Sequence, residues 1–138
     1  SADATTSTGK LLLSTALTDI NDGDVLGRID FKAVVEASGT DAVLAGASIW
    51  AEADATFTDE VNSTDLVFAT GDSGAATEKL RIDSTGQVTF ADGAIDVDIA
   101  SHDGTNGLKL GGTLITTTAA EINGASTIGK QIAMAIVF

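Results

Sequence analysis

The chain contains no cysteine, no proline and no tyrosine among its 138 residues, and its seven basic residues face twenty acidic ones. Without cysteine it has neither a disulfide scaffold nor a thiolate metal site. The formal net charge of −13 disfavours nucleic acid and anionic membrane surfaces as partners, because phosphate binding requires clustered lysine and arginine. The acid excess is typical of a solvated surface.

Large side chains are also scarce. The chain has one tryptophan and five phenylalanines, whereas alanine, glycine, serine and threonine make up nearly half of it. A monomer of this composition buries little apolar area per residue, and buried apolar area is what offsets chain entropy. We therefore expect several copies of the chain to pack together.

The sequence has no long apolar segment. Its longest apolar run, Ile132 to Phe138, is far shorter than the roughly 20 residues that span a bilayer. The first residues are neither basic nor apolar, so they do not resemble a signal peptide. We expect a soluble protein without membrane insertion.

No residue pattern indicates an enzyme. His102 is the only histidine, and Ser101, His102 and Asp103 are too close along one turn to adopt the geometry of a catalytic triad. We expect His102 to be an exposed loop residue. One histidine without cysteine cannot hold zinc, and no glycine-rich phosphate loop occurs. We therefore expect no catalytic residue and no cofactor.

Two weaker ligand hypotheses stay open. The acidic turn from Asp19 to Asp24 superficially resembles a calcium-binding EF-hand loop, but its glycine falls one position early, and we interpret it as a plain turn. Trp50 is the only aromatic platform of a kind that a sugar site uses, and we expect it to pack against a neighbouring strand or subunit instead.

Short alternating segments between Asp-Gly, Asn-Gly and Ser-Gly turns predict an all-β fold. The expected strands are 28–33, 43–57, 65–70, 78–83, 87–91, 94–100 and 108–115. Thr118 and Glu121 have the spacing of a helix capping box, and Asn123-Gly124 is a stop signal. The sequence therefore predicts at most one short helix, near 118–123.

The chain divides into three segments by composition. Residues 1–10 are expected to form a flexible or attachment arm, and residues 11–91 a compact antiparallel β unit. Residues 92–138 have brief strands, glycine-rich turns and too few large side chains for a core of their own. We expect them to form a thin, intertwined β stalk.

The apolar C-terminal segment, Ile132 to Phe138, alternates larger residues with alanine and valine and would be aggregation-prone at an exposed edge. It is either the last strand of its own domain or a strand docked into neighbouring copies. We favour docking, which makes the segment an assembly element.

Three segments resemble structural proteins of tailed bacteriophages. Thr77 to Val88 (TEKLRIDSTGQV) is similar to a signature common in tail fibres, and Leu108 to Asn123 resembles segments of fibre shafts. Asp22 to Phe31 is similar to the strand that opens those fibre units. The resemblance implies a homotrimer on the virion surface, in contact with capsid or tail proteins.

The sequence differs from the fibre signature in ways that favour some kinds of phage structural protein over others. Thr89-Phe90 replaces the usual Gly-Ile-Gly ending of the signature, and we expect no chaperone-like domain of the kind that often follows it in long fibres. A short fibre or a capsid decoration protein is therefore favoured. Two alternatives stay open: a tail-fibre module that binds a host surface receptor, and a strand-donating subunit of an extracellular bacterial filament.

The assembly interface is expected to use the apolar residues of the stalk and of the C-terminal segment. They are Ile95, Val97, Ile99, Leu108, Leu110, Leu114, Ile132, Met134, Ile136 and Phe138.

Deleting Ile132–Phe138 should weaken assembly, because the deletion removes an apolar strand that neighbouring copies would bury. Light scattering coupled to size-exclusion chromatography measures the mass of the particle. An unchanged oligomer after the deletion would refute the docking role of this segment.

Overall fold

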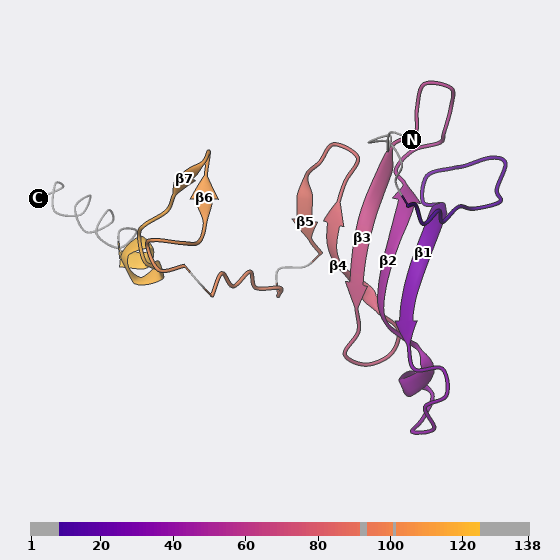
Figure 1. Cartoon of the computed structure of the whole chain (residues 1–138), viewed down its shortest axis with the longest axis horizontal. Coiled ribbons are helices and arrows are strands. Elements are labelled where there is room, and N and C mark those ends of the chain that lie inside the picture. The colour runs from indigo at the N-terminus through magenta and orange to yellow at the C-terminus, as the bar shows by residue number, and fades with distance from the viewer. Residues whose placement is uncertain (1–8, 92–93, 101, 125–138) are drawn as a thin grey trace, which may run out of the picture. The chain divides into compact units, whose positions relative to one another are not determined.

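The computed structural model describes residues 9–91, 94–100 and 102–124, and it divides the chain into two units, Ser1–Ile95 and Asp96–Phe138 (Figure 1). The first unit holds a five-stranded antiparallel sheet, and the second holds a two-stranded hairpin and a short helix. The sequence predicts an all-β fold, and the structure confirms that the described chain is mostly β. Each unit is described separately below.

The sheet of the first unit is a meander, in which each strand pairs with the next strand along the chain (Figure 1). A short 3-10 turn, η1 (Asp41–Val43), lies between the first two strands. The strands are β1 (Val25–Lys32), β2 (Ala45–Ala53), β3 (Thr64–Thr70), β4 (Thr77–Ile82) and β5 (Val88–Phe90). All five coincide with segments that the sequence predicts, with ends that differ by a few residues.

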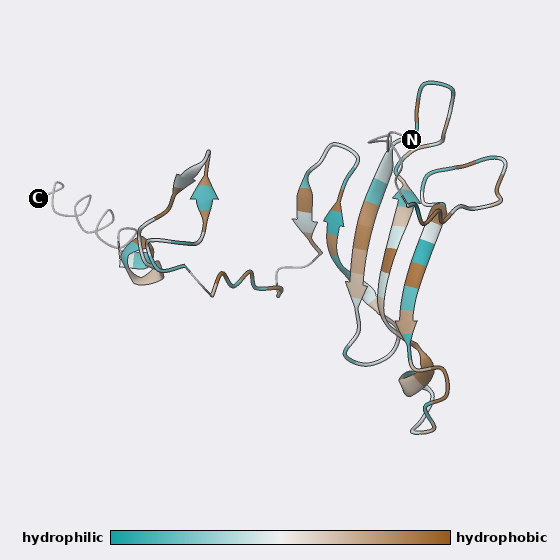
Figure 2. Cartoon of the chain, viewed as in Figure 1, coloured by the Kyte–Doolittle hydropathy of each residue, from teal (hydrophilic) through white to brown (hydrophobic). Residues whose placement is uncertain are grey.

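The register of the meander sorts side chains onto two faces, because directly paired residues of an antiparallel sheet share a face. Hydropathy alternates along β1, as Figure 2 shows, whereas the run Leu66–Ala69 of β3 is apolar on both faces. One row across all five strands is Arg28, Trp50, Val67, Arg81 and Thr89. The adjacent row is Ile29, Ile49, Phe68, Leu80 and Phe90.

We call the two surfaces the polar face and the apolar face. The polar face carries Arg28, Asp30, Ser48, Trp50, Glu52, Asp65, Val67, Ala69, Glu78, Arg81 and Thr89. The apolar face carries Ile29, Phe31, Ala47, Ile49, Ala51, Leu66, Phe68, Leu80, Ile82, Val88 and Phe90.

The buried residues of the sheet lie mainly on the polar face. Ser48, Asp65, Val67 and Ala69 are all at most 4% exposed, and Val67 is the largest apolar side chain among them. Val67 lies between Trp50 and Arg81 in the register, so long side chains flank this central row. The thin core that the composition predicts is therefore a strip on β2 and β3.

The turn between β4 and β5 is built by Asp83. Its Oδ1 accepts hydrogen bonds from the backbone N–H of Thr85 and of Gln87, both at 2.9 Å, and from the Thr85 hydroxyl at 2.7 Å. These bonds, that of the hydroxyl above all, hold the pKa of the Asp83 carboxyl below its usual range. The turn closes the segment that resembles the fibre signature.

The second unit contains a tight hairpin, β6 (Lys109–Leu110) paired with β7 (Thr113–Leu114). The single strand predicted over 108–115 is therefore wrong. Gly111 and Gly112 both have positive φ, 56° and 81°, which only glycine adopts without strain, and they reverse the chain there.

The predicted short helix is confirmed, since residues 119–124 are helical. The Thr118 hydroxyl accepts the backbone N–H of Glu121 at 3.2 Å, and Glu121 Oε2 accepts the backbone N–H of Thr118 at 2.8 Å. This reciprocal pair is the capping box that the sequence predicts.

The strand expected over 94–100 is absent from the structure, which describes that segment without regular structure (Figure 1). The Ile99 carbonyl instead accepts the backbone N–H of His102 in a turn, at 2.8 Å. Alternation alone predicts a strand, but a strand also needs a neighbour for its backbone groups.

Replacing Asp83 with alanine should lower the melting temperature of the chain by a few degrees, because three donors of the β4–β5 turn lose their acceptor. Circular dichroism during heating measures the change. Asp59→Ala, in an exposed loop, is the matched control and should leave the melting temperature unchanged.

Candidate functional site

The polar face is organised around the guanidinium of Arg81 on β4. Its Nη1 lies 2.6 Å from Asp65 Oδ2 and 3.1 Å from Glu52 Oε1, and its Nη2 lies 2.7 Å from Glu78 Oε2. Nε also donates to Glu78 Oε1 at 3.0 Å. One cation therefore joins carboxylates from β2, β3 and β4.

The electrostatics of this cluster favour its charged state. Hydrogen bonds to Glu78 and Asp65 raise the pKa of Arg81, and the Arg81 guanidinium lowers the pKa of Glu78. The Asp65 side chain is only 5% exposed and accepts a second bond, from the backbone N–H of Ser84 at 2.9 Å. These groups satisfy each other, so the cluster braces the sheet.

A second cluster on the polar face surrounds Trp50. The Arg28 guanidinium carbon lies 4.9 Å from the centre of the Trp50 ring, a cation–π distance, and Arg28 Nε lies 2.6 Å from Asp30 Oδ1. Trp50 Nε1 donates to Glu52 Oε2 at 2.9 Å and so joins the two clusters. Trp50 thus packs against a side chain of the neighbouring strand β1, which is one of the two arrangements that the sequence predicts.

Ser48 completes this second cluster beneath the long side chains. Its hydroxyl donates to Asp30 Oδ1 at 2.6 Å and accepts from Arg28 Nη2 at 2.8 Å. These bonds, that of Ser48 first and that of Arg28 second, lower the pKa of Asp30. The polar face thus carries its charges as internal pairs.

Large side chains of the apolar face are exposed to solvent, whereas the charged groups of the polar face are paired with one another. Phe31 is 55% exposed, Val88 53%, Phe90 41%, Leu66 39% and Ile29 38%. Soluble monomers rarely leave so many neighbouring large apolar side chains uncovered.

A hollow of about 340 Å³ lies on this face, where small residues occupy β1 and β2. Its floor includes Gly27 and Ala51, and larger side chains border it. A Cβ on Gly27 would lie 2.8 Å from Leu13 Cβ, so glycine allows the N-terminal segment to approach the strand there. Leu13 itself is 44% exposed and also lines the hollow.

Most of the predicted stalk residues are exposed in the described chain. Val97 is 60% exposed, Ile99 38%, Leu108 43% and Leu110 62%, whereas Leu114 is half-buried. Ile95 is half-buried and belongs to the first unit. The predicted residues Ile132, Met134, Ile136 and Phe138 lie outside the described residues.

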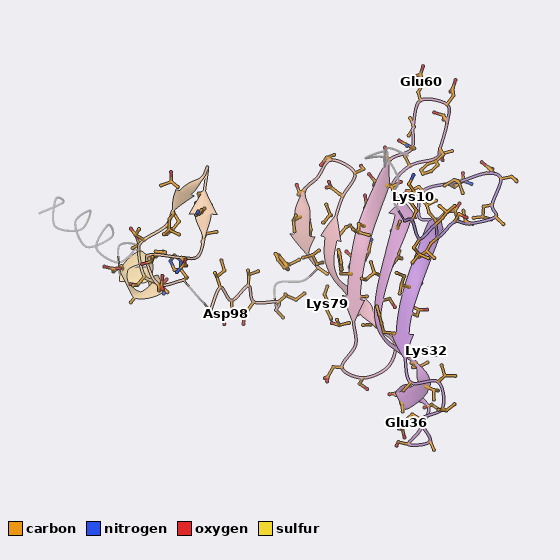
Figure 3. The ribbon with its side chains drawn as sticks, viewed as in Figure 1. Lys10, Lys32, Glu36, Glu60, Lys79 and Asp98 are labelled. Atoms are coloured by element: carbon orange, nitrogen blue, oxygen red, sulfur yellow. The ribbon has the colours of Figure 1, made fainter. Side chains whose placement is uncertain are left out.

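The structure brings Val97 and Ile99 together with the capped helix. They line a hollow of about 430 Å³ with Asp98, which Figure 3 labels, and with His102 and Thr118. Leu108 and Leu114 lie on the hairpin, where the Ile115 N–H donates to the Leu108 carbonyl at 2.8 Å. The structure therefore groups the stalk residues in two places.

His102 is not the exposed loop residue that the sequence predicts, because it is half-buried and bonded through both ring nitrogens. Nε2 lies 3.1 Å from the Thr117 carbonyl, and Nδ1 accepts the backbone N–H of Leu108 at 3.4 Å. The ring joins the hairpin to the start of the helix. The tight turn alone did not reveal this, since the partners lie several residues away in the sequence.

The acidic turn at 19–24 is held by its own backbone. Asp24 Oδ2 accepts the backbone N–H of Asn21 at 2.7 Å, which is the bonding of a plain turn. Within the described residues, no group of three or more histidine, cysteine, aspartate or glutamate side chains is placed to hold a metal ion.

Other acidic side chains lie in the loops around the sheet. Figure 3 labels Glu60 at the tip of the loop between β2 and β3, and Glu36 in the loop that follows β1. Glu36 accepts bonds from the hydroxyl and the backbone N–H of Ser38, which lower its pKa.

The comparisons with known proteins add no relative. Neither the protein-family models nor the curated proteins gave a match to this chain. Among helices in the described ranges, none has the length and apolar character that crossing a bilayer requires.

Sequence reasoning did not identify the apolar face as a candidate site. Its signal was present in pairs of large apolar residues two positions apart, such as Leu66 and Phe68 on β3 or Leu80 and Ile82 on β4. Alternation within one strand reveals a face but not the register that aligns five strands into one surface.

Replacing Arg81 with glutamine should destabilise the chain by about 3 kcal/mol, because the buried carboxylate of Asp65 and its neighbours lose their common cation. The wild type should also lose stability as the pH falls through the usual carboxyl range. The lowered pKa of Glu78 means that its contribution is present above about pH 4.5 and disappears on protonation.

The variant should therefore show a flatter dependence of stability on pH below 5 than the wild type, measured by thermal unfolding at matched protein concentration. Arg28→Gln is the control on the same face, where the pair with Asp30 is more exposed and should contribute less. Equal losses in the two variants would contradict the bracing role of Arg81.

Proposed function

We propose that this chain is a non-enzymatic structural protein of a tailed-phage virion, which assembles as a homotrimer into a short fibre or a capsid decoration on the virion surface. The observation that carries the proposal is the uncovered apolar face of the sheet, with five large side chains between 38% and 55% exposed. A chain with such a surface is suited to assembly.

The chemistry of the polar face supports a mechanical role. Arg81, Glu52, Asp65 and Glu78 are bonded to one another, so their charges stabilise the sheet and are not free to act on a ligand. His102 is likewise engaged through both ring nitrogens.

The segment that resembles the fibre signature supports the same interpretation. Arg81 joins three strands, Ile82 lies on the apolar face, and Asp83 accepts the bonds of the turn. The Ser84 N–H bonds to Asp65. The motif therefore encodes a rigid hairpin, which is what a structural module repeated among fibres needs.

The proposed trimer also uses the second unit. Exposed apolar residues at Val97, Ile99 and Leu110 suit burial by neighbouring copies. In this proposal the three chains combine thin cores into one, and the acidic exterior keeps the particle solvated.

The proposal predicts that antibodies against the recombinant chain label the surface of intact tailed particles from its source. Electron microscopy with gold-conjugated antibody gives the location, and mass spectrometry of gradient-purified particles should recover peptides of the chain. Preimmune serum and particles stripped of surface proteins are the controls.

Other results of the labelling and mass-spectrometry experiment would favour a different function for this chain. Label on open filaments without particles would favour the strand-donating subunit. Particle labelling together with saturable adsorption of the free protein to bacterial cells would favour a host-receptor module. Peptides found only in the soluble cell fraction would refute a virion location.

A further inference from the structure

We propose that the apolar face of the β1–β5 sheet is an interface between copies of this chain. The proposal deepens the assembly role above by naming the partner and the surface. It concerns residues of the first unit, whereas the sequence places the assembly residues mainly in 95–138. It holds whether or not the assembled particle is part of a virion.

The size of the face is the first argument. Strand spacings of about 4.8 Å and rises of about 3.4 Å per residue give a flat footprint of roughly 400 Å². Protruding side chains make the accessible area larger, toward the roughly 800 Å² per partner that a stable complex buries. Exposed apolar patches larger than a few hundred Å² mark interaction sites, so a face of this extent is suited to an interface.

Charge is the second argument, and it favours an identical chain as the cover. Within the regular register, the paired rows of the apolar face contain no charged residue; Lys32 pairs with Ala45 beyond a bulge at the end of β1. Arg28, Glu52, Asp65 and Arg81 all lie on the opposite face. With a net charge of −13, two copies repel each other through most of their surfaces. The apolar face is where they can meet without burying charge.

Shape is the third argument. The hollow at Gly27 and Ala51 lies beside large exposed side chains such as Leu66, so the face has a depression and a ridge next to each other. In a closed trimer each copy can place its ridge in the depression of the next copy, because such an interface joins two different parts of the same surface. Sheets pack face to face in this way at a distance of about 10 Å.

The N-terminal segment does not replace this partner in the described structure. Leu13 reaches the hollow at Gly27, but Val88 and Phe90 on the distant edge strand remain 53% and 41% exposed. These exposed residues make the interface testable, because a substitution there changes the surface more than the fold.

The first test compares two neighbouring residues of β5 that lie on opposite faces. Val88→Glu places a charge on the apolar face, and Thr89→Glu places the same charge on the polar face, where the wild-type residue is also exposed. Sedimentation of the full-length chain should show a dissociation constant at least tenfold higher for Val88→Glu. Thr89→Glu should match the wild type.

Circular dichroism confirms that both variants are folded, and Phe31→Glu on β1 repeats the test at the opposite edge. If both apolar-face variants assemble like the wild type, the proposal is wrong. A wild-type chain that is monomeric at micromolar concentration also overturns it.

A second measurement tests whether the apolar face is covered by a second copy or by a segment of the same chain. Because the wild type has no cysteine, Leu66→Cys introduces a single thiol on the apolar face. A maleimide dye should label it slowly in concentrated protein and at least tenfold faster after dilution. Equal rates at all concentrations would mean an uncovered face or a cover from the same chain, and both contradict the proposal.

The results also separate this proposal from the proposed function. A monomeric chain recovered from purified particles would overturn the homotypic interface and leave the virion role intact. A chain that assembles through the apolar face but is absent from particles would overturn the virion role and leave the homotypic interface intact.

Discussion

The ion cluster of Arg81 determines which side of this sheet is closed. One guanidinium bonds carboxylates from β2, β3 and β4, and the fully buried Val67 and Ala69 lie on the same face. The face that carries the charges is therefore also the face that carries the core. Removing the cation would leave the buried Asp65 carboxylate without its charge partner.

The open apolar face follows from the same arrangement. Successive side chains of a strand point to opposite faces of the sheet. Because the ion pairs occupy one face, the large apolar residues between them lie together on the opposite face. Natural domains bury the apolar face of such a sheet against a second layer. The proposed contact between copies supplies that layer without burying charge.

The structure differs from the sequence-based expectation where the hydrogen-bond partners of a residue lie several residues away along the chain. His102 is bonded to Thr117 and Leu108, and an exposed loop residue was the expectation from its turn alone. The strand expected at 94–100 has the required alternation, but the described segment has no regular structure, and the Ile99 carbonyl instead accepts the backbone N–H of His102 in a turn.

The sequence by itself determined the local structure: strands where apolar residues alternate, a hairpin where Gly111 and Gly112 meet, and a capped helix from Thr118 and Glu121. Those features depend on neighbours a few residues apart. Only the tertiary structure decided the register that aligns five strands, the joining of Glu52, Asp65 and Glu78 by Arg81, and the continuous apolar face. These depend on pairings between distant segments, which alternation within one strand does not specify.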